Sequence, residues 1–232
     1  MHLFYASEIN SDLFVFDREE SRHCKVLRLK SADIIYLTDG KGTLYHATIT
    51  DNDPNAYKAS IIKTIPNFNK RNYKLHVGIS PTKNPERFEW FLEKACEIGI
   101  DEITPLICER SEKTTIKTER LEKIIVSAMK QSFSAFLPKL NVCKLFESFV
   151  EQNFRAEKFV AFCNDDDRTL LKNLYLQGQD AVILIGPEGD FTFEEIELAK
   201  KTGFTAISLG NSRLRTETAG MVACGIISLM NQ

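Results

Sequence analysis

Apolar residues in the first seventy positions come in short runs separated by polar residues and glycine, a pattern typical of β-strands. One short helix is predicted over residues 19–27. Asp39-Gly40-Lys41-Gly42 separates two of the runs and predicts a hairpin, because glycine adopts the positive φ that such a turn needs. Several strands at short spacing favour a small β-barrel. The runs cover residues 3–6, 13–16, 34–38, 44–49 and 57–65.

From Lys74 onward, short apolar runs alternate with longer segments of helical period. The predicted helices span 85–98, 118–135, 192–202 and 216–230, and the predicted strands span 74–80, 103–107, 159–163, 181–185 and 205–209. This alternation indicates an α/β domain with a largely parallel sheet. Trp90 lies on the apolar face of the first helix, so we expect it in the core. The polar, proline-containing segment 66–72 predicts a boundary between domains 1–70 and 73–232.

Composition narrows the class of protein without identifying a function. The 232 residues are 43% hydrophobic and 27% charged, with a formal net charge of -2, which is ordinary for a globular protein and unlike a polybasic nucleic-acid binder. Residues 156–232 carry seven Lys or Arg against eleven Asp or Glu, so any polyanion is expected to bind the earlier part. No signal peptide or membrane span is visible, and we expect a cytoplasmic protein.

The six cysteines are isolated from one another, with no Cys-x-x-Cys pair. Zinc ligands usually come as close pairs, and disulfide scaffolds are shorter and richer in cysteine. The pattern predicts free thiols in a reducing compartment and no metal site.

Two glycine-bearing loops are candidate ligand-binding segments. Ile185-Gly186-Pro187-Glu188-Gly189 follows one predicted strand, and Leu209-Gly210 through Leu214-Arg215-Thr216 follows the next. Open α/β sheets bind ligands at the carboxyl ends of such strands. Neither loop matches a phosphate-binding motif, and a carboxylate at Glu188 would repel phosphate. A cationic ligand with an adenine, such as S-adenosylmethionine, fits better; a plain tight turn is the alternative for the first loop.

The two loops resemble the signature of the RsmE family, the 16S ribosomal RNA uridine N3 methyltransferases of the SPOUT superfamily. The matching segments are Ile185–Gly189, Leu209-Gly210 and Leu214–Ala219. Further similarities run in order through nearly the whole chain, at His23, Val26-Leu27-Arg28, Lys83, Trp90, Lys94, Glu97, Gly99, Pro105, Arg110-Ser111, Gln131-Ser132 and Pro138. The chain departs from the family pattern at Asp190, Ser134 and Ser212.

The resemblance implies a PUA-like β-barrel followed by a SPOUT α/β domain with a C-terminal trefoil knot. It also implies a homodimer, S-adenosylmethionine as cofactor, and 16S ribosomal RNA or the small ribosomal subunit as substrate. The implied cofactor-binding residues are Ile185, Gly186, Pro187, Glu188, Gly189, Leu209, Gly210, Leu214, Arg215 and Thr216.

Methylation at uridine N3 requires loss of the N3 proton, so a site for it must stabilise negative charge on the base. Arg215 is the candidate for that stabilisation, and Glu217 is the candidate proton acceptor. Alternatively, Glu217 stabilises a helix N-terminus, and Arg215 forms an ion pair with Glu188 or Glu217.

Candidate RNA-binding residues are exposed basic or polar side chains, which could equally be ordinary solvated surface. They are His23, Lys25, Arg28, Lys83, Arg110 and Gln131. Three other functions remain open: methylation of a ribose 2′-hydroxyl or of transfer RNA, RNA binding without catalysis, and flavodoxin-like nucleotide binding.

Overall fold

The computed structural model describes residues 2–9, 11–162 and 169–232, which form two compact units. Met1–Lys70 and Met129–Leu137 make up the first unit, and Arg71–Ala128 with Pro138–Gln232 make up the second. The segment 129–137 differs from the expected division, because its backbone pairs with the first unit: Gly42 N donates to Ala135 O at 2.9 Å. Cys163, the last residue of the predicted strand 159–163, lies outside the described residues.

The first unit is built on one five-stranded sheet with the order β1-β3-β4-β5-β2. The predicted strands are confirmed, and the predicted hairpin joins β3 to β4 in antiparallel pairing. Gly40 and Gly42 adopt φ of 71° and 105° at this turn, as the sequence predicts. The strands are β1 (Leu3–Tyr5), β2 (Leu13–Val15), β3 (Ile34–Thr38), β4 (Leu44–Asp51) and β5 (Lys58–Ile65).

Helix α1 (Arg18–Val26) starts at Asp17, whose side chain accepts a hydrogen bond from Glu20 N at 2.8 Å. The Glu20 carboxylate in turn accepts from Lys130 Nζ at 2.6 Å, and both side chains are largely buried. The ammonium of Lys130 also lies 5.8 Å from the centre of the Phe4 ring. These contacts fix the segment 129–137 to the helix and the sheet of the first unit.

The second unit contains a parallel sheet of eight strands, with the order β11-β13-β10-β12-β6-β7-β8 and β9 paired to β7. Its central strand, β12, is buried along its whole length, which explains the continuous apolar run Ala181–Ile185. The strands are β6 (Leu75–Ile79), β7 (Glu102–Ile107), β8 (Lys139–Leu140), β9 (Lys144–Leu145), β10 (Glu157–Ala161), β11 (Thr169–Leu170), β12 (Ala181–Ile185) and β13 (Thr205–Ser208).

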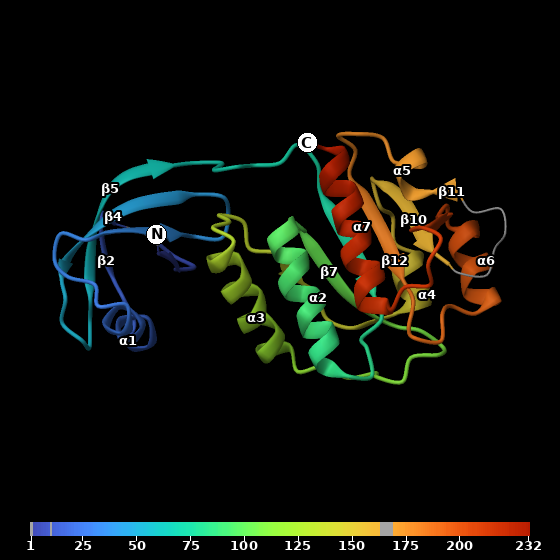
Figure 1. Ribbon diagram of the computed structural model, residues 1–232, viewed down its shortest axis with the longest axis horizontal. Helices are drawn as coiled ribbons and strands as arrows, with labels where there is room; N and C mark the ends of the chain where they lie inside the picture. Colours follow the sequence, from blue (N-terminus) through green and yellow to red (C-terminus); the bar gives the residue numbers. More distant parts are fainter. Residues whose placement is uncertain (1, 10, 163–168) are drawn as a thin grey trace. The chain divides into compact units, whose positions relative to one another are not determined.

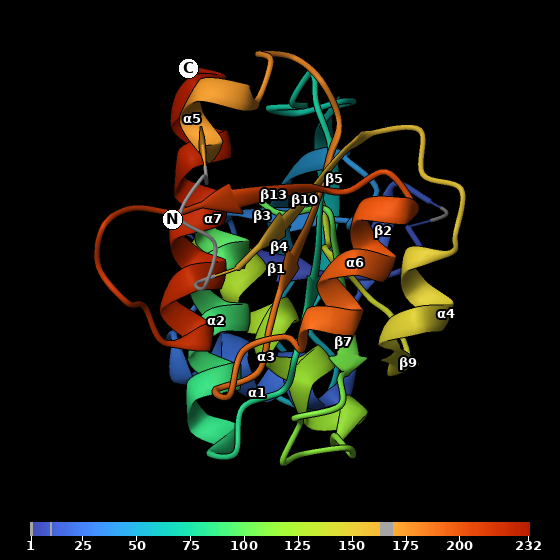
Figure 2. The same ribbon diagram turned by 90° about the vertical axis from the view of Figure 1, so that its right-hand side faces the viewer.

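Helices cover both faces of this sheet. Helices α2 (Pro85–Ile98) and α7 (Thr216–Met230) pack side by side on one face, and α4 (Phe146–Val150) and α6 (Phe193–Lys201) lie on the other (Figures 1 and 2). A Cβ at Gly220 of α7 would come within 2.6 Å of the Phe91 ring, so glycine there permits close packing with α2. Helices α3 (Thr118–Gln131) and α5 (Leu171–Leu174) complete the described elements. Nowhere in the described ranges is a helix long and apolar enough to span a membrane.

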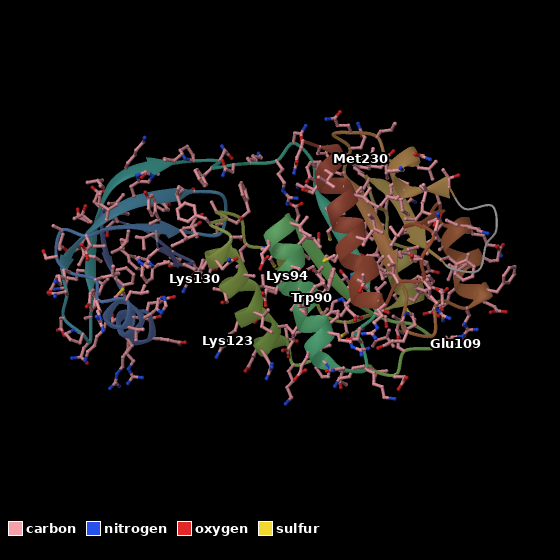
Figure 3. All side chains as sticks on the ribbon, in the orientation of Figure 1. Trp90, Lys94, Glu109, Lys123, Lys130 and Met230 are labelled. Carbon is pink, nitrogen blue, oxygen red and sulfur yellow. The ribbon has the colours of Figure 1, made fainter. Side chains whose placement is uncertain are left out.

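Two sequence predictions about these helices are wrong. The helix expected over 118–135 ends at Gln131, because Phe133 adopts a φ of 56° and Ser134 N bonds back to Met129 O. Trp90 is 40% exposed rather than buried, because the apolar face of α2 is formed by Phe88, Phe91, Leu92, Ala95 and Cys96 and the indole lies off that stripe. Trp90, which is labelled in Figure 3, instead borders a groove that residues of α3 also line.

A buried histidine in β6 predicts pH-dependent stability. Burial lowers the pKa of His76 to about 4, below its ordinary value near 6.5, although Glu102 opposes the shift. Between pH 6.5 and 4, the unfolded chain therefore binds a proton at His76 that the folded chain does not bind. The contribution of His76 to the free energy of unfolding is constant above pH 6.5 and falls by about 3 kcal/mol as the pH approaches 4. Urea unfolding of wild type and His76→Gln at several pH values should show this decrease mainly in wild type. Parallel pH profiles for the two proteins would contradict it.

Candidate cofactor and active site

A cavity of about 290 Å³ opens at the carboxyl ends of β10, β12 and β13. Strand β10 pairs with β12 on one side and with β13 on the other, so the loops that follow β12 and β13 meet around the end of β10. The wall consists of Ala161, Phe162, Ile185, Gly186, Pro187, Glu188, Asp190, Ile207, Ser208, Leu209, Gly210, Ser212, Arg213, Leu214, Arg215, Thr216 and Ala219. Nine of the ten predicted cofactor residues line this one cavity, and Gly189 is the exception.

A side-chain hydrogen bond joins the two loops. Thr216 Oγ1 donates to Gly186 O at 3.0 Å, and both residues are buried. Gly210 has a φ of 140°, a conformation that L side chains rarely adopt, and Ser208 Oγ bonds to both its N–H and its carbonyl. The backbone around the cavity is therefore held in place from within the two loops.

Neighbouring loops hold the Gly-Pro-Glu-Gly segment from outside. Lys83 N donates to Glu188 Oε1 at 2.9 Å, and Arg110 Nη1 donates to Gly189 O at 2.9 Å. The ammonium of Lys83 is exposed and pairs with Glu112 at 2.7 Å, which raises the pKa of Lys83. Two residues predicted to bind RNA thus also position a loop of the cavity.

The buried Glu195 supports the same region. Its Oε2 accepts from Thr192 N at 2.8 Å in the capping box of α6, and its Oε1 accepts from Glu109 N at 3.0 Å. Glu109 comes from the loop after β7 and is labelled in Figure 3. The capping box joins residues three positions apart, whereas the second hydrogen bond joins residues 86 positions apart and leaves no local signal in the sequence.

The two candidate catalytic residues lie in different surroundings. Arg215 is exposed, lines the cavity, and forms no ion pair within the described part of the chain. Glu217 is 7% exposed in the first turn of α7 and lies 3.8 Å from Arg87 Nε of α2. Glu217 is absent from the cavity wall, so the structure gives it a partner in α2 rather than in the loops.

The remaining candidate RNA-binding residues belong to the first unit. His23 and Lys25 form the basic last turn of α1, and Arg28 follows the helix with a φ of 58°. Gln131 ends α3, and all four side chains are exposed. They therefore present hydrogen-bonding and basic groups to solvent on the strand-rich unit.

The described cysteines do not offer a reactive thiolate near the cavity. Cys24, Cys96, Cys108 and Cys224 are buried free thiols, and burial raises the pKa of Cys96 and Cys224 to about 12. Among residues 2–9, 11–162 and 169–232, no three His, Cys, Asp or Glu side chains come together as metal ligands.

Asp190 occupies a left-handed backbone conformation with a φ of 62°. Aspartate tolerates this conformation better than most residues, and its Oδ1 accepts from Phe191 N at 2.9 Å. We expect Asp190→Ala to lower the free energy of unfolding by about 1 kcal/mol and Asp190→Gly to lower it less. Urea unfolding checks this; equal stability of the alanine variant and wild type would contradict it.

The second unit is a parallel α/β domain with a two-loop cavity at the carboxyl edge of its sheet, and the first unit is a separate strand-rich domain. The chain is therefore a two-domain protein with an α/β ligand-binding domain. The RNA methyltransferase domain model matches residues 69–228, and the RNA methyltransferase PUA domain model matches residues 16–62. The chain therefore belongs to the RNA methyltransferase family, within the group of ribosomal RNA small subunit methyltransferase E.

Individual relatives are similar to this chain along nearly its whole length. Ribosomal RNA small subunit methyltransferase E of Mesomycoplasma hyopneumoniae is 31% identical over 95% of this chain and 96% of its own. The crystal structure of a probable rRNA-methyltransferase from Porphyromonas gingivalis is 40% identical, with a TM-score of 0.92 over 100% of this chain and 98% of that one. Ribosomal RNA small subunit methyltransferase E from Neisseria gonorrhoeae, bound to S-adenosyl methionine, is 26% identical with a TM-score of 0.90 over 100% and 98%.

Proposed function

We propose that this protein transfers a methyl group from S-adenosylmethionine to N3 of a uridine in small-subunit ribosomal RNA. The observation that carries the proposal is the cavity in which the loops after β12 and β13 meet. The Neisseria gonorrhoeae relative, whose fold matches over the whole chain, is bound to S-adenosyl methionine. We further propose that the chain works in the cytoplasm and that its C-terminal segment forms the trefoil knot typical of the SPOUT superfamily.

The residues of the cavity fit this cofactor. Ile185, Leu209 and Leu214 supply an apolar wall suited to an adenine ring, and the glycine-bearing backbone offers N–H and C=O groups to its edge. Glu188 and Asp190 place carboxylates in the wall, which attract a sulfonium cation, beside the guanidinium groups of Arg213 and Arg215. When bound, the cofactor supplies an activated methyl group.

Residues of this chain then have to stabilise the negative charge that develops on the base. Loss of the N3 proton leaves a negative charge shared by O2 and O4. Of the two exposed arginines in the cavity wall, Arg213 and Arg215, we assign Arg215 to stabilise it. We propose Glu217 as the proton acceptor through water. Its contact with Arg87 gives it a second task, because this pair joins the start of α7 to α2.

RNA binding is assigned to both units. We propose that His23, Lys25, Arg28 and Gln131 contact RNA from the first unit, and Lys83 and Arg110 from the second. Contacts of these side chains to phosphates would position the strand, whereas the cavity would select the base. The uridine has to be unstacked for N3 to reach the cavity, which favours a single-stranded or flipped target.

We propose that α7 mediates formation of a homodimer. A helix that is apolar all round normally lies buried on all sides, yet Val222 and Ile226 are only half-buried and Leu229 is 69% exposed. Gly225 lies between them, and a Cβ there would meet nothing within 4 Å. This stripe offers a second copy of the chain an apolar face with room for close approach.

Sedimentation of an α7 variant tests the dimer. We expect wild type to sediment at twice the 26.4 kDa chain mass, and Ile226→Arg to sediment as a monomer because a buried unpaired charge disrupts an apolar interface. Leu176→Arg is the matched control, since Leu176 is 64% exposed outside α7. A monomeric wild type, or a dimeric Ile226→Arg variant, would contradict the proposal.

Mass spectrometry of ribosomal RNA tests the proposed reaction in cells. Small-subunit ribosomal RNA and transfer RNA from cells with and without the gene are digested separately to nucleosides and compared. We expect one 3-methyluridine to be missing without the gene and restored by wild type. Loss of a ribose-methylated nucleoside, loss of a transfer RNA modification, or no loss would favour one of the rival functions instead.

A further inference from the structure

A second cavity, of about 430 Å³, opens beside the carboxyl end of β6. Its walls come from the connection between β6 and α2, from the segment 113–117, and from the first turns of α2 and α3. All of these residues belong to the second unit. The volume lies within the range of about 300–1,000 Å³ that small-molecule sites occupy.

The second cavity shares its supporting loops with the cofactor cavity. Strand β6 pairs with β12, and the pairing continues beyond the strands, where Ser80 N donates to Ile185 O at 3.1 Å. Three residues further on, Lys83 N donates to the Glu188 carboxylate. The loop that borders the cofactor cavity is therefore hydrogen bonded to the loop that borders the second cavity.

The charges at the second cavity favour an anionic ligand. Lys113 and Lys117 line it, and neither forms an ion pair within the ranges that the structure describes. Arg120 is neutralised by Glu89 at 2.6 Å, which leaves Glu86 as the single unpaired carboxylate of the wall. Two free cations thus outweigh one free anion.

The remaining wall is part polar and part apolar. Thr82 is buried, and its Oγ1 donates to Asn84 O at 2.7 Å, so its lone pairs stay available to a donor. Ile116 is half-buried and supplies an apolar surface. A nucleotide matches this set, because it combines a phosphate, hydroxyl and N–H donors, and a flat base.

We propose that this cavity binds a nucleotide of the RNA strand that flanks the target uridine, with its phosphate at Lys113 and Lys117. The proposal rests on the proposed function, since it takes RNA as the substrate. Glu86 then accepts a hydrogen bond from a ribose 2′-hydroxyl, which DNA lacks. The ion pair between Lys83 and Glu112 holds the segment that carries Lys113 against the loop from β6.

Charge removal tests the subsite. We expect the double variant Lys113→Gln/Lys117→Gln to raise KM for small ribosomal subunits about tenfold and to leave the Kd for S-adenosylmethionine unchanged. The slope of log affinity against log salt should fall by about 0.7, the value for one phosphate contact to a single strand. The control is Lys172→Gln/Lys201→Gln, which removes two exposed lysines that line neither cavity and should leave KM unchanged.

Steric filling gives an independent test that leaves the charges in place. Thr115 lines the cavity with an exposed side chain, so Thr115→Trp should also raise KM for the subunit without changing cofactor binding. If wild type is active and both cavity variants match its KM, or if the control loses as much as the charge variant, the subsite is wrong. If wild type methylates no RNA, the proposed function itself fails.

Discussion

Replacing Arg215 with alanine is expected to slow methyl transfer by about 10²- to 10³-fold in a single turnover. This is the usual effect of removing one group that stabilises developing negative charge in an active site. The guanidinium lies in the cavity wall, is exposed, and forms no ion pair among the described residues, so it is available to the deprotonated base. The measurement is a rapid-quench assay at saturating cofactor and enzyme.

Two further variants separate charge stabilisation from a structural effect. Arg215→Lys keeps the positive charge but not the guanidinium geometry, and should recover part of the rate. Arg155→Ala removes an exposed arginine outside the cavity and should retain the wild-type rate. A wild-type rate for Arg215→Ala, with cofactor still bound, would show that this role is wrongly assigned.

Filling the cavity from α7 is expected to abolish cofactor binding while the fold persists. Ala219 lines the cavity and is half-buried, so Ala219→Trp places a large ring where the cofactor is expected. A ligand at 100 times its Kd stabilises the folded state by about 2.7 kcal/mol. In a chain of this size that corresponds to a rise in Tm of roughly 5–10 °C. We expect this rise in wild type and none in Ala219→Trp.

Ala219→Ser provides the matched control, because it adds one small polar atom at the same position. It should keep most of the rise in Tm caused by S-adenosylmethionine. The two variants should also have similar Tm values without cofactor. An Ala219→Trp protein with a wild-type Tm rise would place the cofactor outside this cavity.

The larger elements and the candidate cofactor loops could be predicted because their signals are local. Alternating strands and helices and the hairpin glycines each act over a few residues. Strands β12 and β13 are close in the sequence, and their carboxyl ends flank β10. The loops that follow them therefore converge, as the pattern of a parallel sheet indicated.

The rest depends on contacts between distant residues. Trp90 was placed in the core because it lies near apolar residues, but which face of a helix is buried is decided by its neighbours in space. Lys83 and Arg110 form hydrogen bonds to the Gly-Pro-Glu-Gly loop, and these bonds join residues that are 105 and 79 positions apart in the sequence. Ala161 and Phe162 reach the cavity only because β10 lies between β12 and β13.

The same pairing in space explains the position of segment 129–137. Thr38 Oγ1 donates to Ala135 O across 97 residues, so this segment joins the first unit although it follows a helix of the second. Its apolar pattern continues that of the helix before it, which is why the sequence predicted a helix to residue 135. The helix ends at Gln131 instead, since Phe133 adopts a φ of 56° and Ala135 O then accepts hydrogen bonds from Thr38 and Gly42.

Transfer of an isotopically labelled methyl group tests the central claim most directly. Purified protein is incubated with S-adenosylmethionine that carries a trideuterated methyl group and with small ribosomal subunits from cells that lack the gene. The RNA is then digested to nucleosides for mass spectrometry. We predict one trideuterated 3-methyluridine per subunit. A label on a ribose oxygen or on another base, or no label at all, would contradict the account.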